Sequence, residues 1–143
     1  MKIVPDTDYR KLSRFWRAHG LEVQVSDTPP DSLLHAWSMT DQDGTLVAAA
    51  ALERRNGFLV LADVAVDPAY RGSHYGVALV TLAEETAAAM GAPEIWLTGK
   101  GPDFYRKLGW QSVPRQDAPP ISKCLHCEDF QVSCHPEIMR KVF

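Results

Sequence analysis

The chain has 143 residues, the length of about one domain. Apolar residues make up 45% and charged residues 23%, which is ordinary for a folded globular protein and argues against a disordered chain. The formal net charge of −3 excludes a strongly basic nucleic-acid-binding protein as the first interpretation. The longest apolar run, Leu46–Leu52, is too short to span a membrane, and residues 1–6 lack the apolar core of a signal peptide. We therefore expect a cytoplasmic protein with no membrane or nucleic-acid partner.

The first predicted elements are a short strand at residues 2–4 and an amphipathic helix at residues 7–19. Asp6 or Thr7 is the expected N-cap of this helix, and Gly20 ends it. The helix is predicted from residues that recur near helical spacing: Leu12, Phe15, Trp16 and His19.

Three strands then follow in an antiparallel meander, at residues 33–40, 45–54 and 58–66. Asp43-Gly44 and Asn56-Gly57 join them, and such pairs are the strongest short-range signals for hairpin turns. The run Ala48–Ala51 taken alone resembles a helix, but the two flanking turns favour a strand.

The second half of the sequence predicts a strand–helix–strand crossover. A long helix ends near Met90, before Gly91 and Pro93, and residues 94–98 form the next strand, parallel to the third. A short helix at 102–108 and strands at 110–113 and 138–143 complete the chain. The fold class is thus α/β of the α+β type, a mixed and mostly antiparallel sheet flanked by helices.

The loop between the third strand and the long helix has the chemistry of an anion site. The free N–H groups at a helix N-terminus attract phosphate groups, and Arg71 adds a permanent positive charge. Gly72 and Gly76 leave space where a ligand touches the backbone. The alternative is an ordinary tight turn beside a solvated arginine.

Two segments resemble motifs of the GNAT acetyltransferase superfamily. Residues 64–79 are similar to its acetyl-coenzyme A motif, an Arg or Gln, two residues, Gly, one residue, then Gly or Ala. Arg71 and Gly76 match this pattern, while His74 stands at the middle glycine. The segment Phe-Tyr-Arg-Lys-Leu-Gly-Trp at 104–110 resembles the family's Phe-Tyr-x-x-x-Gly-aromatic motif. The resemblance covers most of residues 1–113.

The resemblance implies acetyl-CoA as co-substrate. Two positions depart from the family pattern: His74, which is strained if its φ is positive, and Thr98, where the family often has Asn. The residues that it assigns to the co-substrate are Val64, Ala65, Val66, Arg71, Gly72, Ser73, His74, Tyr75, Gly76, Val77, Thr98 and Tyr105.

The implied reaction is direct attack of a primary amine on the thioester. A backbone N–H near Val66 would polarise the carbonyl, and Tyr105 would protonate the departing thiolate. Tyr105 can instead be a packed aromatic. Asp63 is the first candidate for the base, because its apolar neighbours would raise its pKa. Glu53 on the adjacent strand is the second candidate, and some enzymes of this kind use no protein base.

All three cysteines fall in the C-terminal part, residues 114–143. We expect a single domain spanning residues 1–143, with this C-terminal part packed on or beside the rest of it. Cys124, Cys127 and Cys134, with His135 preferred to His126, could bind zinc. An iron–sulfur centre, a redox thiol pair or three free thiols are the alternatives.

The sequence therefore predicts an acetyl-CoA-dependent N-acetyltransferase acting on a small-molecule or peptide amine, with a homodimer as a plausible assembly. Two other classes stay open. One is a non-catalytic acyl-CoA-binding sensor, and the other is a metal-stabilised interaction module on the same scaffold.

Overall fold

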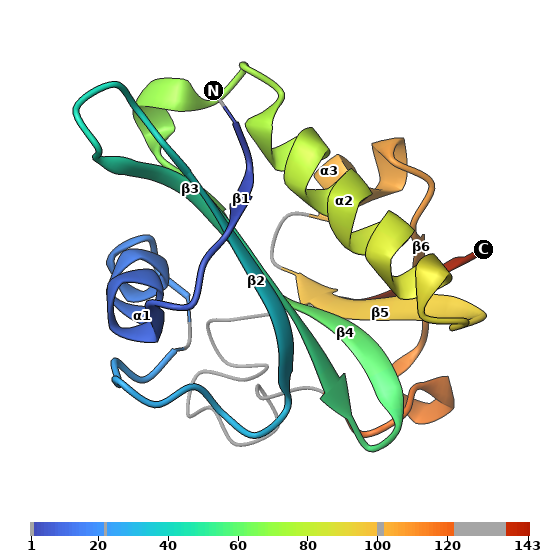
Figure 1. Ribbon diagram of the computed structural model, residues 1–143. Helices are drawn as coiled ribbons and strands as arrows, with labels where there is room; N and C mark the ends of the chain where they lie inside the picture. The colour runs from blue at the N-terminus through green and yellow to red at the C-terminus, as the bar shows by residue number, and fades with distance from the viewer. Residues whose placement is uncertain (1, 22, 100–101, 122–136) are drawn as a thin grey trace.

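The computed structural model describes residues 2–21, 23–99, 102–121 and 137–143 (Figure 1). Within these residues, seven strands form one sheet in the order β1-β2-β3-β4-β5-β7-β6. Neighbouring strands pair antiparallel, except for the parallel pair β4 and β5. This confirms the expected mixed, mostly antiparallel sheet with a crossover after the third strand of the meander.

The predicted elements lie close to their observed bounds, and β2 and β4 agree to the residue. The strands are β1 (Val4–Pro5), β2 (Leu33–Thr40), β3 (Leu46–Arg55), β4 (Phe58–Val66), β5 (Glu94–Gly99), β6 (Gln111–Ser112) and β7 (Glu137–Val142). The helices are α1 (Tyr9–Ala18), α2 (Tyr75–Ala89) and α3 (Pro102–Lys107), with 3₁₀ turns at Pro68–Tyr70 and Arg115–Asp117. In the part of the chain described, none of the helices has the length and apolar character that crossing a membrane requires.

The start of α1 differs from the prediction. Its N-cap is Asp8, whose carboxylate accepts the Lys11 N–H at 3.2 Å, rather than Asp6 or Thr7. Asp6 is engaged elsewhere: it accepts the Ser38 hydroxyl at 2.6 Å and lies 2.6 Å from the Lys11 Nζ. A contact with strand β2, distant in sequence, therefore decides which carboxylate caps the helix.

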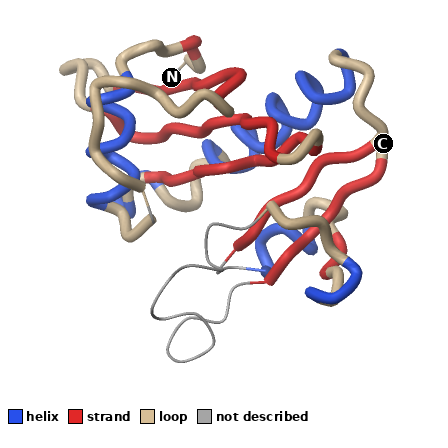
Figure 2. Tube along the Cα trace, turned by 90° about the horizontal axis from the view of Figure 1, so that it is seen from below, coloured by secondary structure: helices blue, strands red, loops and turns tan. Residues whose placement is uncertain are grey.

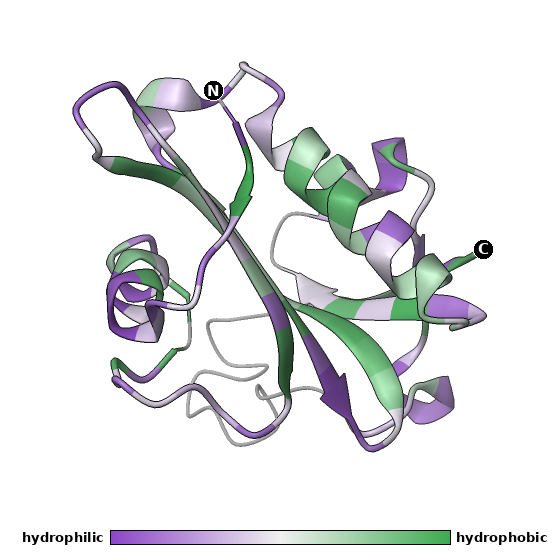
Figure 3. Ribbon diagram, in the orientation of Figure 1, coloured by the Kyte–Doolittle hydropathy of each residue, from purple (hydrophilic) through white to green (hydrophobic). Residues whose placement is uncertain are grey.

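The alanine run in β3 explains how helices cover both faces of the sheet. Ala48 and Ala50 pack in the core that includes α2, whereas Ala49 and Ala51 pack against α1, and all four are fully buried. Such small side chains let both helices approach the same strand. Hydrophobic colours dominate α2 and the central strands, whereas α1 shows both hydrophobic and hydrophilic colours (Figure 3).

The sheet opens between β4 and β5. Their parallel register is limited to Val60 opposite Trp96, and beyond this pair the two strands diverge (Figures 1 and 2). On its other side β4 carries a β-bulge: Asp63 pairs with Ala51 and Leu61 with Leu52, so Ala62 is the extra residue. Bulges twist and bend a strand, which suits a strand that must leave its neighbour.

The C-terminal strand β7 completes the sheet between β5 and β6. Its residues Glu137–Val142 run antiparallel to the whole of β5. The sequence predicts a last strand at 138–143 but not its position in the sheet.

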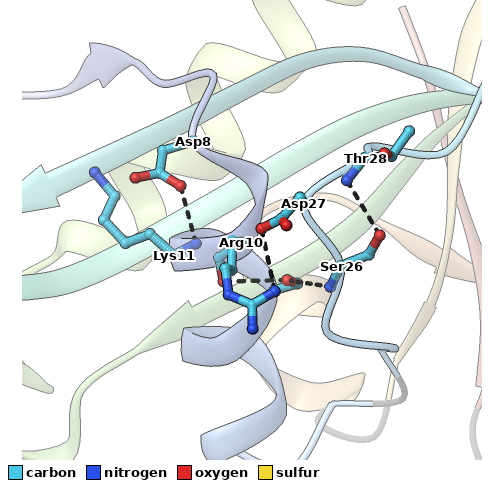
Figure 4. Close-up of polar contacts among 7 residues, drawn as sticks. Asp8, Arg10, Lys11, Ser26, Asp27 and Thr28 are labelled. Carbon is cyan, nitrogen blue, oxygen red and sulfur yellow. Dashed lines mark hydrogen bonds and ion pairs between the residues drawn. The ribbon is translucent and has the colours of Figure 1, made fainter.

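The segment that follows α1 is held against that helix. Arg10 pairs with Asp27 at 3.1 Å, and the Ser26 N–H donates to the Ser13 hydroxyl at 3.3 Å. Ser26 in turn accepts the Thr28 N–H, so the segment folds back along α1 (Figure 4). These contacts fix the route of the chain from α1 to β2.

Candidate active site

A cavity of about 780 Å³ lies where β4 and β5 diverge. Its wall is built from the second half of β4, the loop and first turn leading into α2, the end of β5, α3, and the C-terminal end of α1. The predicted co-substrate residues in this wall are Val64, Ala65, Val66, Arg71, Gly72, His74, Tyr75, Gly76, Val77, Thr98 and Tyr105. Ser73 lies in the same loop but is not part of the wall. Segments far apart in sequence thus converge on one space.

The loop before α2 presents its backbone to this cavity. The first helical bond of α2 runs from the Ala78 N–H to the His74 carbonyl at 3.0 Å, which leaves the preceding N–H groups outside the helical ladder. His74 is the N-cap and contributes no side-chain hydrogen bond to the helix. With the helix dipole behind them, these N–H groups suit a phosphate.

His74, at the middle-glycine position of the motif that residues 64–79 resemble, has a left-handed conformation. Its φ is 63° and its ψ is 19°, so the expected strain at this position is real. Gly72 has a φ of 90°, which explains the glycine there. At Gly76 the reason differs: an added Cβ would lie 3.3 Å from the Phe104 ring.

Tyr105 lies in the cavity wall on α3. Its ring packs over Gly99, where an added Cβ would lie 3.3 Å from Tyr105 Cε2, and edge-on against Trp110 at 5.9 Å between ring centres. Burial raises the pKa of Tyr105 to about 12, so the hydroxyl keeps its proton at neutral pH. A protonated phenol beside the cavity is what a proton donor requires.

Thr98 enters the wall from β5, across the gap from β4. Its Oγ1 is buried, and no residue of the described chain forms a hydrogen bond with it. A buried hydroxyl without a partner costs free energy, so a ligand group in the gap would satisfy it.

The two candidate bases are separated by the fold. Asp63 is 5% exposed and lines the cavity. Glu53 is 1% exposed and stands behind the wall, where its Oε1 accepts hydrogen bonds from Ser32 Oγ at 2.8 Å and Arg55 Nε at 3.1 Å. Position alone therefore favours Asp63.

Part of the cavity wall was not predicted from the sequence. Arg55 and the segment from His19 to Leu21 also line it, and neither belongs to a recognised motif. His19 caps the C-terminus of α1, with its Nδ1 2.7 Å from the Phe15 carbonyl and its Nε2 3.9 Å from Asp67. An arginine beside a hairpin turn gives no signal in the sequence, because such positions are usually solvent-exposed.

A model of the family described as "Acetyltransferase (GNAT) family" matches residues 4–110. The chain belongs to the GNAT acetyltransferase family. The amino-acid acetyltransferase of Vibrio cholerae is 28% identical over 120 residues, which are 80% of this chain and 26% of that protein. The chain thus spans about a quarter of the length of this curated relative.

Solved GNAT structures share the fold. A GNAT acetyltransferase from Staphylococcus aureus superposes with a TM-score of 0.70 at 18% identity, covering 99% of this chain and 98% of the other. The N-acetylglutamate synthase of Neisseria gonorrhoeae, solved with coenzyme A and N-acetyl-glutamate, gives 0.69 at 14% identity, covering 99% of this chain and 35% of that one. At these identities the likeness establishes the fold alone.

The predicted metal ligands of this GNAT chain cannot be placed. Cys124, Cys127, Cys134 and His135 lie outside the described residues. Elsewhere, across residues 2–21, 23–99, 102–121 and 137–143, no group of three or more His, Cys, Asp or Glu side chains could hold a metal ion.

Proposed function

We propose that this GNAT protein is an N-acetyltransferase that transfers the acetyl group of acetyl-CoA to a primary amine by direct attack. One observation carries the proposal: a single cavity joins the anion-binding loop before α2 to the Tyr105 hydroxyl region and to buried Asp63. Each end of that cavity has the chemistry that one of the two substrates needs.

The part of the cavity beside the loop before α2 fits the diphosphate of acetyl-CoA. Arg71 supplies charge, and the free N–H groups of Tyr75, Gly76 and Val77 supply directed donors. Gly72 and Gly76 leave no side chain between the ligand and the backbone. Val64, Ala65 and Val66 on β4 and Thr98 on β5 would hold the pantetheine arm in the gap between the strands.

The remaining groups suit acyl transfer. Asp63, directly or through a water, takes one proton from the ammonium so that the nitrogen can attack the thioester carbonyl carbon. A backbone N–H near Val66 stabilises the developing oxyanion. As the new C–N bond forms and the C–S bond breaks, Tyr105 gives its proton to sulfur, and the second proton lost by nitrogen restores Tyr105 through solvent.

The test is turnover by the purified chain with labelled acetyl-CoA and a panel of amines. Amino acids come first because the Vibrio cholerae relative is named an amino-acid acetyltransferase. The expected result is equal release of free coenzyme A and N-acetylated product. Acetyl-CoA binding without turnover across the panel would contradict the proposal and favour the acyl-CoA sensor.

A further inference from the structure

Arg55 is a half-buried cation in the wall of the cavity. Its side chain is 16% exposed; its Nε donates to Glu53 Oε1 at 3.1 Å and its Nη1 to the Ile121 carbonyl at 2.8 Å. Its Nη2 lies 3.0 Å from the same Glu53 oxygen as an ion pair. That nitrogen is buried, and no acceptor in the described chain forms a hydrogen bond with it.

An arginine in this condition points to a missing acceptor. Buried N–H groups are nearly always hydrogen-bonded, and the contact of Nη2 with Glu53 is an ion pair that lacks a hydrogen bond. The planar guanidinium offers its donors in a fork that matches a carboxylate. Because Arg55 stands in the cavity wall, a ligand in the cavity can supply the carboxylate.

The guanidinium is held firmly before any ligand arrives. Glu53 Oε1 also accepts the Ser32 hydroxyl at 2.8 Å, and Asn56 Nδ2 donates to the Pro120 carbonyl at 2.6 Å, beside Ile121. Glu53 is thus a positioning residue. It also balances the charge of Arg55, so the site offers directed N–H groups rather than net positive charge.

Arg55 shares one face of the sheet with Asp63. Side chains alternate along a strand, so Ala51, Glu53 and Arg55 of β3 point to the α1 side, and Asp63 is paired with Ala51. The Tyr9 hydroxyl reports the proximity of these charges. Burial raises the pKa of Tyr9 to about 12, with Asp63 and Glu53 adding to the rise and Arg55 opposing it.

We propose that the acceptor amine carries a carboxylate close to its amino group, as an α-amino acid does, and that Arg55 binds that carboxylate while Asp63 faces the amino group. The inference rests on the proposed function and names its acceptor class. The amino group of a zwitterion meets the Asp63 carboxylate, and its carboxylate meets the directed N–H groups of Arg55. A plain amine leaves the buried Nη2 of Arg55 with its Glu53 ion pair alone, and a carboxylic acid without the amine meets the charge of Asp63.

The test compares each amino acid with the amine left by its decarboxylation: tyrosine with tyramine, histidine with histamine, lysine with cadaverine. Wild-type kcat/KM should favour the amino acid in the accepted pair by about 10- to 100-fold, the effect of a charge-assisted hydrogen bond. Arg55→Met should remove this preference mainly through KM. The control is Arg54→Met, which removes the same charge from an exposed neighbour on the opposite face of β3 and should change nothing.

A second variant guards against misfolding, since Arg55→Met leaves Glu53 buried without its partner. Glu53→Gln/Arg55→Met removes both charges and should show the same loss of preference. Equal acetylation of both members of each pair by the wild type would overturn the inference and leave the proposed function intact.

Binding without turnover separates the two proposals further. Calorimetry with the same amino acids and the coenzyme A-bound protein should show binding that Arg55→Met weakens by about 10- to 100-fold and Arg54→Met does not. Absence of amino-acid binding, or equal binding by Arg55→Met, overturns the inference whether or not any amine is acetylated.

Discussion

The pKa of Tyr105 defines the pH range in which it can act. Burial raises that pKa to about 12, so the hydroxyl stays protonated throughout the neutral and mildly alkaline range. In the proposed mechanism the donor must be protonated, which the raised pKa ensures, but the same rise makes the phenol a weaker acid relative to a thiol, whose pKa is about 8.5. The loss of the donor form begins only as pH approaches 12.

Tyr105→Phe should lower kcat by about 10²-fold, because the proposed mechanism uses the hydroxyl only as the thiolate leaves. Affinity for acetyl-CoA should be nearly unchanged. Steady-state kinetics between about pH 7 and 10 should show no alkaline loss of activity from this group in the wild type. Wild-type turnover by the variant would remove Tyr105 from the mechanism.

His74→Gly should stabilise the free protein. A non-glycine residue in the left-handed region costs about 1–2 kcal/mol, while glycine adds about 0.5–1 kcal/mol of unfolded-state entropy, so the net gain is up to about 1.5 kcal/mol. Gly72→Ala is the control with the opposite expected effect on stability. Its φ is 90° and an added Cβ has open space around it, so alanine introduces backbone strain without a steric clash. Urea unfolding should move the two variants in opposite directions.

At the scale of elements, Asp6 joins β1 and α1 to β2. Its carboxylate meets the Ser38 hydroxyl on β2, the Lys11 ammonium on α1 and the N–H of Asp8. Burial acts to raise the pKa of Asp6, but these hydrogen bonds and the charge of Lys11 outweigh it, and the pKa lies below its ordinary value. The ionised form is therefore favoured by folding.

Asp6→Asn should lower the free energy of unfolding at pH 7 by about 1–2 kcal/mol, the scale of charge-assisted hydrogen bonds. Because the folded-state pKa is lowered, the stability from Asp6 is present above about pH 4 and is lost as pH falls through the folded-state pKa. Thermal unfolding should show the two proteins converging between about pH 4 and 2. Asp27→Asn, in an exposed pair with Arg10, should change stability by less than about 0.5 kcal/mol. A constant difference down to pH 2 would contradict the role of Asp6.

For the molecule as a whole, the cavity couples ligand binding to folding. Its wall draws on α1, β4, the α2 loop, β5 and α3, so a ligand in it contacts elements from most of the chain. A ligand that binds only the folded state at 100 times its Kd adds about 2.7 kcal/mol of stability. Acetyl-CoA should therefore raise the unfolding temperature.

Arg71→Ala should weaken acetyl-CoA binding by about 1–3 kcal/mol, as expected for a lost charge-assisted hydrogen bond, and reduce this thermal shift. Arg14→Ala is the matched control, because Arg14 is exposed on α1 and is not part of the cavity wall. Isothermal titration calorimetry measures both variants. Unchanged affinity of Arg71→Ala would place the diphosphate elsewhere.

Features that depend on neighbouring residues could be predicted from the amino-acid sequence. Asn56-Gly57 predicts the turn between β3 and β4, and the observed φ values of 51° and 85° show why these residue types are needed. The two motifs that place Arg71 and Tyr105 are likewise contiguous segments, so their residues could be named from the sequence. Residues in the cavity wall were predictable wherever they belong to such a segment.

Contacts between distant segments distinguish residues that look alike in their local sequence. Asp63 and Glu53 both follow apolar residues in neighbouring strands, yet one lines the cavity and the other is held by Ser32, 21 residues earlier. Arg55 is fixed by a hydrogen bond to the carbonyl of Ile121, 66 residues later, and no local sequence pattern predicts this contact. The position of β7 between β5 and β6 is likewise set by contacts between segments that are distant in sequence. Strand order, the bulge at Ala62 and long-range hydrogen bonds arise from packing between distant segments, and packing is a property of the whole chain.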